Sequence, residues 1–159
     1  MTSLAFDRPN IVMMPPLAAL TGLILCVTLH FIWKPWWLPG FPNLFAIVIG
    51  IGIIAGGFVI AHAATNSFHD ADTNVNPLKP ALKLVTDGPY RFIRNPMYLG
   101  LLMVHFGIGL AGSLDWTLVV TPALWVFLHF GAVLWEEAYL TEKFGDEYLA
   151  LLSRTRRWI

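Results

Sequence analysis

Charged residues are scarce in this chain of 159 residues. Lys, Arg, Asp and Glu make up 13% of it, whereas 57% of the residues are hydrophobic. A soluble domain of this size would carry about 25% charged residues. The composition therefore excludes an ordinary water-soluble domain and predicts a single unit that folds in lipid.

Cysteine is nearly absent, and no excess of one charge is present. The one cysteine, Cys26, lies inside an apolar run, so it forms no intramolecular disulfide and is interpreted as a packing residue. The net charge of zero gives no general attraction to nucleic acid. The first apolar segment lacks the basic start and the small-residue cleavage site of a signal peptide. The chain also lacks internal repeats and low-complexity linkers.

Long apolar runs, by contrast, are abundant. A membrane-spanning helix needs about 20 apolar residues, and four segments approach or reach that length: 16–33, 44–64, 96–112 and 116–135. The third is short, so it is expected either to tilt little or to form a tight hairpin with the fourth through "GSLD". The sequence predicts an all-α integral membrane protein with four transmembrane helices in one domain, 1–159.

The basic residues predict the orientation of these helices. Four spans place the N-terminus, the loop between the second and third spans and the C-terminal tail on one side. Nine of the ten basic residues fall there, and Lys34 falls on the other side. This asymmetry predicts that both termini are cytoplasmic. The nine are Arg8, Lys79, Lys83, Arg91, Arg94, Lys143, Arg154, Arg156 and Arg157.

The stretch "DGPYRFIRNPMYLG", residues 87–100, directly precedes the third apolar segment. Asn95 is a favoured helix N-cap and Pro96 a favoured first helical residue, so the third span is expected to begin there. The free amides and the positive dipole end of such a helix attract an anionic ligand. The alternative is interfacial anchoring, because arginine and tyrosine are common at cytoplasmic helix ends.

Three further residues surround this expected helix start. Tyr90 and Tyr98 flank Arg94, and Gly100 leaves room for a ligand or another helix to approach the backbone.

Two acidic residues directly follow the fourth apolar segment. Glu136 and Glu137 stand in "LWEEAYLTEKFGDEYLALLSR", where a membrane exit ordinarily carries lysine or arginine. Carboxylates at this position need partners, and the arginines of the same side supply candidates. The alternative to a ligand site is a structural network of ion pairs.

Together, "LVTDGPYRFIRNPMYLG" and "EEAYLTEKFGDEYLALLSR" resemble the isoprenylcysteine carboxyl methyltransferase family, with its bacterial relatives and the related phospholipid N-methyltransferases. The resemblance covers residues 73–157. It implies an integral membrane enzyme that binds S-adenosyl-L-methionine on the cytoplasmic side, between the last two spans, the central loop and the C-terminal tail. It also implies location in a bacterial inner membrane.

The resemblance assigns expected roles to the residues of both motifs. Arg94 and Arg154 are expected to orient an anionic methyl acceptor as the catalytic pair. Glu136 or Glu137 would accept hydrogen bonds from the cofactor, and the helix start would receive its carboxylate. The expected cofactor-binding residues are Tyr90, Asn95, Pro96, Tyr98, Gly100, Glu136 and Glu137. No metal site, nucleic-acid partner or obligatory protein partner is expected.

The acceptor stays open at this point. Eukaryotic carboxyl methyltransferases commonly carry Arg-His-Pro where this chain has Arg94-Asn95-Pro96, and asparagine does not titrate near neutral pH. A prenylcysteine, another lipophilic carboxylate, a thiol and a lipid amine all remain possible acceptors, alongside membrane lipids as the surroundings.

Two classes without methyl transfer compete with this interpretation. His105 and His129 are expected at similar depth on neighbouring spans, which suits a haem-binding electron-transfer subunit. Interhelical hydrogen bonds are the commoner role for such histidines, so we expect no metal there. A non-catalytic membrane scaffold explains the spans and leaves both polar motifs unexplained.

Overall fold

The computed structural model describes residues 7–40 and 42–159, and within them it is helical without a β-strand. This part of the fold prediction is confirmed. The elements are α1 (Pro15–Ile32), α2 (Leu44–Asp70), a 3₁₀ turn η1 (Gly88–Arg91), α3 (Pro96–Ala111), α4 (Thr117–Leu128), a π-helical turn η2 (His129–Val133), α5 (Leu134–Phe144) and α6 (Asp146–Arg154).

Three of these helical stretches are long and apolar enough to cross a membrane: Pro15–Ile32, Leu44–Asp70 and Thr117–Phe144. The third predicted segment forms the shorter apolar helix α3, of 16 residues. The helices of the second and fourth predicted segments, Leu44–Asp70 and Thr117–Phe144, continue past the apolar runs from which they were predicted, because the polar residues at their ends still favour helix. The glutamate pair therefore lies within a continuous helix and not beyond its end.

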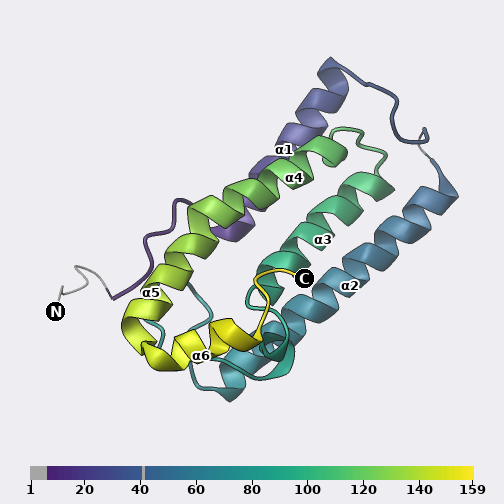
Figure 1. Cartoon of the computed structure of the whole chain (residues 1–159). Helices are drawn as coiled ribbons and strands as arrows, with labels where there is room; N and C mark the ends of the chain where they lie inside the picture. The colour runs from purple at the N-terminus through teal and green to yellow at the C-terminus, as the bar shows by residue number, and fades with distance from the viewer. Residues whose placement is uncertain (1–6, 41) are drawn as a thin grey trace.

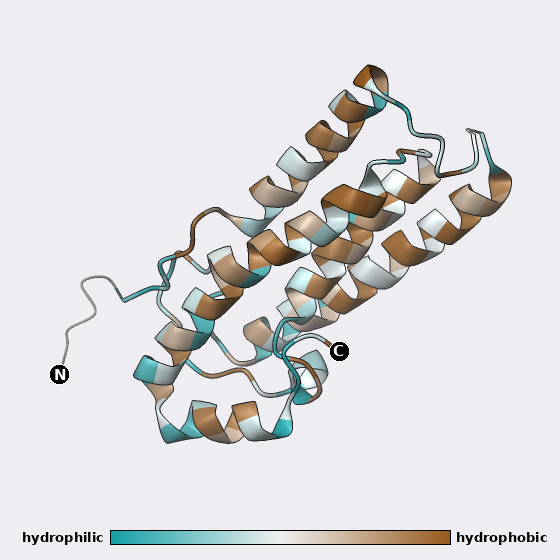
Figure 2. Ribbon diagram, turned by 45° about the horizontal axis from the view of Figure 1, so that its top comes forward, coloured by the Kyte–Doolittle hydropathy of each residue, from teal (hydrophilic) through white to brown (hydrophobic). Residues whose placement is uncertain are grey.

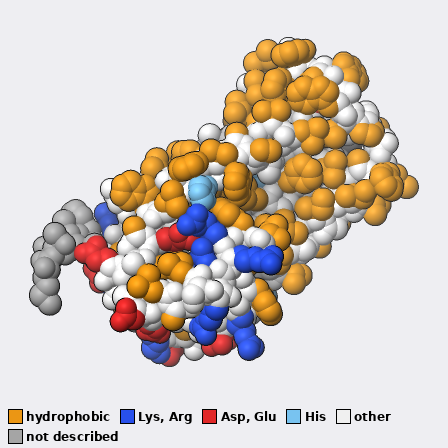
Figure 3. Space-filling view, in the orientation of Figure 1, with side chains coloured by type: hydrophobic (Ala, Val, Ile, Leu, Met, Phe, Trp, Pro, Cys, Tyr) orange, Lys and Arg blue, Asp and Glu red, His pale blue; other side chains and the backbone are white. Residues whose placement is uncertain are grey.

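Helices α1, α2, α3 and the continuous stretch from α4 to α5 run side by side, and successive ones alternate in direction (Figure 1). α3 lies between α2 and α4, and α1 packs against α3 and α4. Hydrophobic residues dominate the long helices, and hydrophilic residues gather around α6 and near the C-terminus (Figure 2). On the face drawn in Figure 3, acidic and basic side chains concentrate at this same end. We call it the charged end.

Close backbone contact joins α2 to α3. A Cβ atom added to Gly57 would lie 2.7 Å from the carbonyl oxygen of Gly100, and one added to Gly100 would lie 2.6 Å from that of Gly57. Gly50 and Gly107 form a second reciprocal pair at 2.7 Å. Small residues bring helices together in this way where lipid provides no hydrophobic force between them. Gly100 thus makes room for a helix, one of the two uses expected from the sequence.

At the opposite end, two connections are tied together. Asp115, fully buried in the turn between α3 and α4, accepts a hydrogen bond from the backbone of Leu38 at 2.6 Å. The indole of Trp116 donates to the carbonyl of Trp33 at 2.7 Å, and these two rings stand edge to face. Aromatic residues that gather at one end of a bundle in this way are typical of a membrane interface.

The glycine contacts give a stability prediction. Gly57→Ala should lower the melting temperature in detergent, because the new methyl group forces the two backbones apart at a cost of about 1–3 kcal/mol. Gly52, on the same helix, has no atom within 4 Å of the place that a Cβ atom would take. Gly52→Ala is therefore the matched control and should leave the melting temperature unchanged or slightly raised. Equal melting temperatures for the two variants would contradict the close packing.

Candidate functional site

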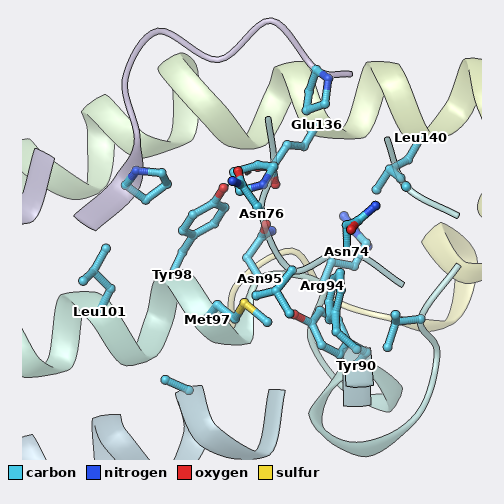
Figure 4. A pocket seen from close by; sticks show the side chains of 18 of the residues that line it. Asn74, Asn76, Tyr90, Arg94, Asn95, Met97, Tyr98, Leu101, Glu136 and Leu140 are labelled. Atoms are coloured by element: carbon cyan, nitrogen blue, oxygen red, sulfur yellow. Dashed lines mark hydrogen bonds between the residues drawn. The ribbon is translucent and has the colours of Figure 1, made fainter. Parts of the chain in front are cut away.

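A cavity of about 600 Å³ opens at the charged end of the bundle. Its walls come from α2, α3, α5 and α6, from the loop that precedes η1, and from the segment that precedes α1. Figure 4 shows side chains from α3, α5 and this loop converging on the same space. The volume lies in the range of small-molecule sites, and polar groups stand at a few points on a mainly apolar wall.

The start of α3 supplies one wall of the cavity. Pro96 opens the helix as predicted, but the expected side-chain cap by Asn95 is wrong: the Asn95 side chain makes no capping bond. Its amide instead donates to the carbonyl oxygen of Arg157 at 2.9 Å. The C-terminal tail folds back to this point, where it competes for the asparagine. The sequence pattern around Asn95 did not include that distant partner.

The C-terminal tail pairs with the chain just before α3. Arg94 donates its backbone N–H to the carbonyl of Arg156 at 2.8 Å, and Arg156 donates to the carbonyl of Phe92 at 3.0 Å. These bonds form an isolated parallel bridge between Ile93 and Arg156. The bridge fixes the tail beside α3, where the partly buried Trp158 packs, like Leu101, against the hydrophobic core.

Glu136 faces the cavity from α5. It is partly buried, and the hydroxyl of the buried Tyr98 donates a hydrogen bond to its carboxylate. Among the described residues, no lysine, arginine or histidine forms an ion pair with Glu136. A carboxylate in an apolar cavity with a single neutral partner favours a cationic ligand group, because burial of an uncompensated charge is costly.

Glu137, the next residue, has the opposite environment. One of its oxygens accepts from Arg94 Nε at 3.2 Å and from Arg157 Nε at 2.9 Å, and the other accepts from Arg157 Nη2 at 2.7 Å. Its side chain is 14% exposed, and it does not line the cavity. The same contact with Glu137 raises the pKa of Arg157. Glu137 thus belongs to a structural network of ion pairs, the alternative that the sequence left open.

Arg94 joins this network to the cavity wall. Besides Glu137, its Nη1 atom donates to the carbonyl oxygens of Thr155, at 2.5 Å, and Leu152, at 3.4 Å. Its side chain is only 11% exposed, and it lines the cavity. The guanidinium therefore ties α5, the end of α6 and the start of α3 together, which fixes one cationic side chain beside the cavity.

The remaining predicted residues separate into three groups. Tyr90, Tyr98 and Gly100 line the cavity together with Arg94, Asn95 and Glu136. Pro96 is buried behind the wall. Arg154 is exposed at the end of α6 and is not part of the wall, so its expected role at the acceptor stays a prediction that this position does not favour.

Several cavity residues were not singled out from the sequence. Asn74 and Asn76 reach the cavity from the central loop (Figure 4), and Tyr139 and Tyr148 reach it from α5 and α6. All four belong to the motif region, in "TNVNP" and "EEAYLTEKFGDEYLALLSR". What the sequence could not supply was the break at Gly145, whose φ of 52° favours glycine and which turns α6 back under the bundle.

Burial also sets the state of the two tyrosines outside the long helices. Burial and the nearby Glu136 carboxylate raise the pKa of Tyr90, and burial together with Glu137 raises the pKa of Tyr148. Both hydroxyls therefore stay neutral and are available as hydrogen-bond donors. Tyr90 also packs edge to face against Phe68, with ring centroids 5.5 Å apart.

The two histidines of the haem hypothesis have other partners. His105 Nδ1 lies 2.9 Å from the hydroxyl of Thr121, and His129 Nδ1 accepts from the indole of Trp158 at 3.3 Å. His129 also stacks on Trp125. The His105 contact joins α3 to α4, as expected for an interhelical hydrogen bond, whereas the His129 contact joins the π-helical turn to the C-terminal tail.

The ion-pair network predicts unequal effects for the two glutamates on stability. Glu137→Gln should destabilise the protein by about 2–4 kcal/mol, because it leaves Arg94 buried without its charge partner; a fully buried pair would cost more. Glu136→Gln removes no ion pair and should cost far less. Thermal unfolding in detergent measures both, with the exposed Glu142→Gln as control. Similar losses for Glu136→Gln and Glu137→Gln would contradict the division of roles.

Comparison with known proteins gives one family and several relatives. The family model described as phospholipid methyltransferase matches residues 45–147. A protein-S-isoprenylcysteine O-methyltransferase of Schizosaccharomyces pombe is 41% identical over 66 residues, which cover 41% of this chain and 28% of the relative. A probable protein-S-isoprenylcysteine O-methyltransferase of Oryza sativa subsp. indica is 28% identical over 122 residues, which cover 72% of this chain and 58% of the relative.

The matches thus span between about a quarter and three fifths of the length of these curated relatives. No solved structure gives a significant match.

Proposed function

Since the chain belongs to the phospholipid methyltransferase family of membrane enzymes, we propose that it transfers a methyl group from S-adenosylmethionine to a lipophilic acceptor at the cytoplasmic membrane surface. The observation that carries the proposal is Glu136, a carboxylate that faces an apolar cavity without a cationic partner among the described residues. The names of the relatives favour a carboxylate of an isoprenylcysteine type as the acceptor.

The residues of the cavity fit this cofactor. S-adenosylmethionine supplies an activated methyl group on a cationic sulfonium, together with an ammonium, a carboxylate, a ribose and an adenine. Glu136 would accept from the ammonium, with Tyr98 holding the carboxylate in place. Asn74 and Asn76 offer amide groups to the ribose and adenine, and the Tyr90 ring offers an aromatic surface.

The apolar part of the cavity suits a lipophilic acceptor. Phe58 and Ala61 of α2 and Leu101 and Val104 of α3 continue the wall from the polar residues into the bundle. Arg94, held by Glu137, provides positive charge beside the cavity for an anionic acceptor group. Methyl transfer to a carboxylate or thiolate needs no proton removal, so this chain's contribution is to bind and align the two partners.

The shortness of α3 supports a position at the membrane surface. A helix of 16 residues is about 24 Å long, whereas the hydrocarbon core is about 30 Å thick. If α3 crosses the membrane in addition to the three longer stretches, its first residues lie just inside the edge of the hydrocarbon core. The cavity at the start of α3 then lies at that edge. Nine of the ten basic residues belong to segments at this end, which favours the cytoplasmic side for it and for both termini.

A lipid amine is the second candidate acceptor, favoured by the description of the matching family. An amine must lose a proton before it is methylated, and Glu136 is the cavity carboxylate that could accept it. The same side chain would then serve the acceptor in place of the cofactor ammonium.

The direct test is a labelled-methyl transfer assay with purified protein in detergent. Acceptors would be a prenylcysteine, its methyl ester, a long-chain thiol and phosphatidylethanolamine. The proposal expects transfer to the prenylcysteine and none to its ester, in which the carboxylate is already blocked. Transfer to phosphatidylethanolamine alone would establish the second candidate, and no transfer to any of the acceptors would contradict both.

Glu136 gives a second prediction, on binding. Glu136→Gln should weaken S-adenosylhomocysteine binding by about tenfold or more, because the ammonium loses a charged acceptor in an apolar site. Calorimetry measures the affinity, and Glu142→Gln is the control. S-adenosylhomocysteine has the ammonium of S-adenosylmethionine but lacks its sulfonium charge. If Glu136→Gln weakens the binding of both compounds equally, Glu136 contacts the ammonium. Unchanged affinity in Glu136→Gln would remove this residue from the cofactor site.

A further inference from the structure

Two segments that are distant in the sequence cover the same cavity. The first precedes α1 and contributes Pro9 and Met14, and the second is the central loop, which contributes residues 74–77 and 79–85 with gaps. We call residues 7–14 and 74–85 the covering segments. The close-up in Figure 4 shows Asn74 and Asn76 of the second segment beside the cavity.

Each covering segment has further hydrogen bonds, within the central loop for one segment and to the π-helical turn for the other. In the central loop, the Thr73 hydroxyl accepts from the backbones of Leu82, at 2.9 Å, and Lys83, at 3.2 Å, and the Asn74 amide donates to the carbonyl of Pro80 at 2.8 Å. In the first segment, Val12 donates to the carbonyl of Gly131 in the π-helical turn at 2.9 Å. The central loop thus has hydrogen bonds of its own, and the first segment has a second attachment, to the π-helical turn.

One hydroxyl group joins both segments to α5. The Tyr139 hydroxyl donates to Asp7 Oδ1 at 2.9 Å and accepts from the backbone of Ala81 at 3.0 Å. Lys143, one turn further along α5, donates to both Asp7 oxygens, at 2.6 and 2.8 Å, and to the Tyr139 hydroxyl at 3.1 Å. One donor and two acceptor positions are all that a hydroxyl offers, and Tyr139 uses each of them.

Tyr139 also lies at the cavity itself. Its side chain is buried, with 6% exposed, and it lines the cavity wall. The Lys143 and Tyr139 contacts lower the pKa of Asp7, so its carboxylate is charged throughout the neutral range.

We propose that Tyr139 is a positioning residue that closes both covering segments over the cavity, and that the bound ligand exchanges when this joint opens. The proposal rests on the proposed function only for the identity of that ligand. The Tyr139 hydroxyl is the group that both segments share, so its opening loosens both of them, while the Lys143–Asp7 ion pair and the Val12 bond to Gly131 remain on the first segment. A joint of this kind sets how fast a ligand enters and leaves, and changes its affinity little while the open state is rare.

Amide hydrogen exchange of the ligand-free full chain in detergent tests the joint without reference to any activity. The reporters are Val12, Leu82 and Lys83, whose own acceptors, Gly131 and Thr73, are not altered. Tyr139→Phe frees Ala81, so it should raise exchange about tenfold at the adjacent Leu82 and Lys83 and leave α3 unchanged. It should also raise exchange at Val12, but less, because Lys143 still holds Asp7. Asp7→Ala should raise it at Val12 only, and Glu142→Gln at none of them.

The second measurement follows S-adenosylhomocysteine by stopped flow. Tyr139→Phe should raise the association and dissociation rates together, by about tenfold each, with the dissociation constant within about twofold of the parent protein. A structural defect would instead weaken affinity without faster association, and that result would overturn the gating role. If Tyr139→Phe does not fold, Asp7→Ala carries the test, because it too should speed exchange at Val12 and ligand entry.

Exchange that rises at one covering segment in Tyr139→Phe, or at neither, would overturn the joint. If the parent protein fails to bind S-adenosylhomocysteine, the proposed function fails, and the amide exchange still decides whether Tyr139 joins the two segments.

Discussion

The ion-pair network of Glu137 with Arg94 and Arg157 is the interaction on which the charged end depends. Three helical segments and the C-terminal tail meet at these side chains, and the arginines donate to Glu137 and to the carbonyl oxygens of Leu152 and Thr155. Bidentate arginine–carboxylate pairs are directional, so the network sets the position of the tail as well as its attachment. Without it, the bridge between Ile93 and Arg156, the Asn95 bond to the Arg157 carbonyl and the packing of Trp158 would alone hold the tail.

This network also explains why two adjacent glutamates have different environments. Neighbouring residues of a helix point about 100° apart, so when Glu137 faces the arginines, Glu136 is turned toward the cavity. The arginines satisfy one carboxylate, and within the described ranges 7–40 and 42–159 the other has the Tyr98 hydroxyl as its hydrogen-bond partner. The same pair therefore supplies both a structural anchor and an anionic group beside an apolar space.

The sequence predicted the long apolar helices, because a long apolar run is a strong and local signal for a membrane-spanning helix. It also selected six of the residues that line the cavity, since Arg94, Asn95 and Glu136 stand out in apolar surroundings and the tyrosines and Gly100 are close to them. It did not predict that Asn95 would bond to the tail, that Arg154 would be exposed, or that Asn74 and Asn76 would reach the site. These depend on how the tail and the loop fold back, and such long-range pairing leaves no period in the sequence.

The short helix α3 and its close contact with α2 explain why a cavity forms at the start of α3. The Gly50–Gly107 and Gly57–Gly100 contacts fix α3 against α2 along its length, so α3 cannot slide to fill the space at its start. Residues of the covering segments and of α6, outside the long helices, close that space. Close helix packing deep in the bundle therefore leaves a mainly apolar cavity with a few polar groups at the charged end, and this wall offers contacts to both charged and apolar ligand groups.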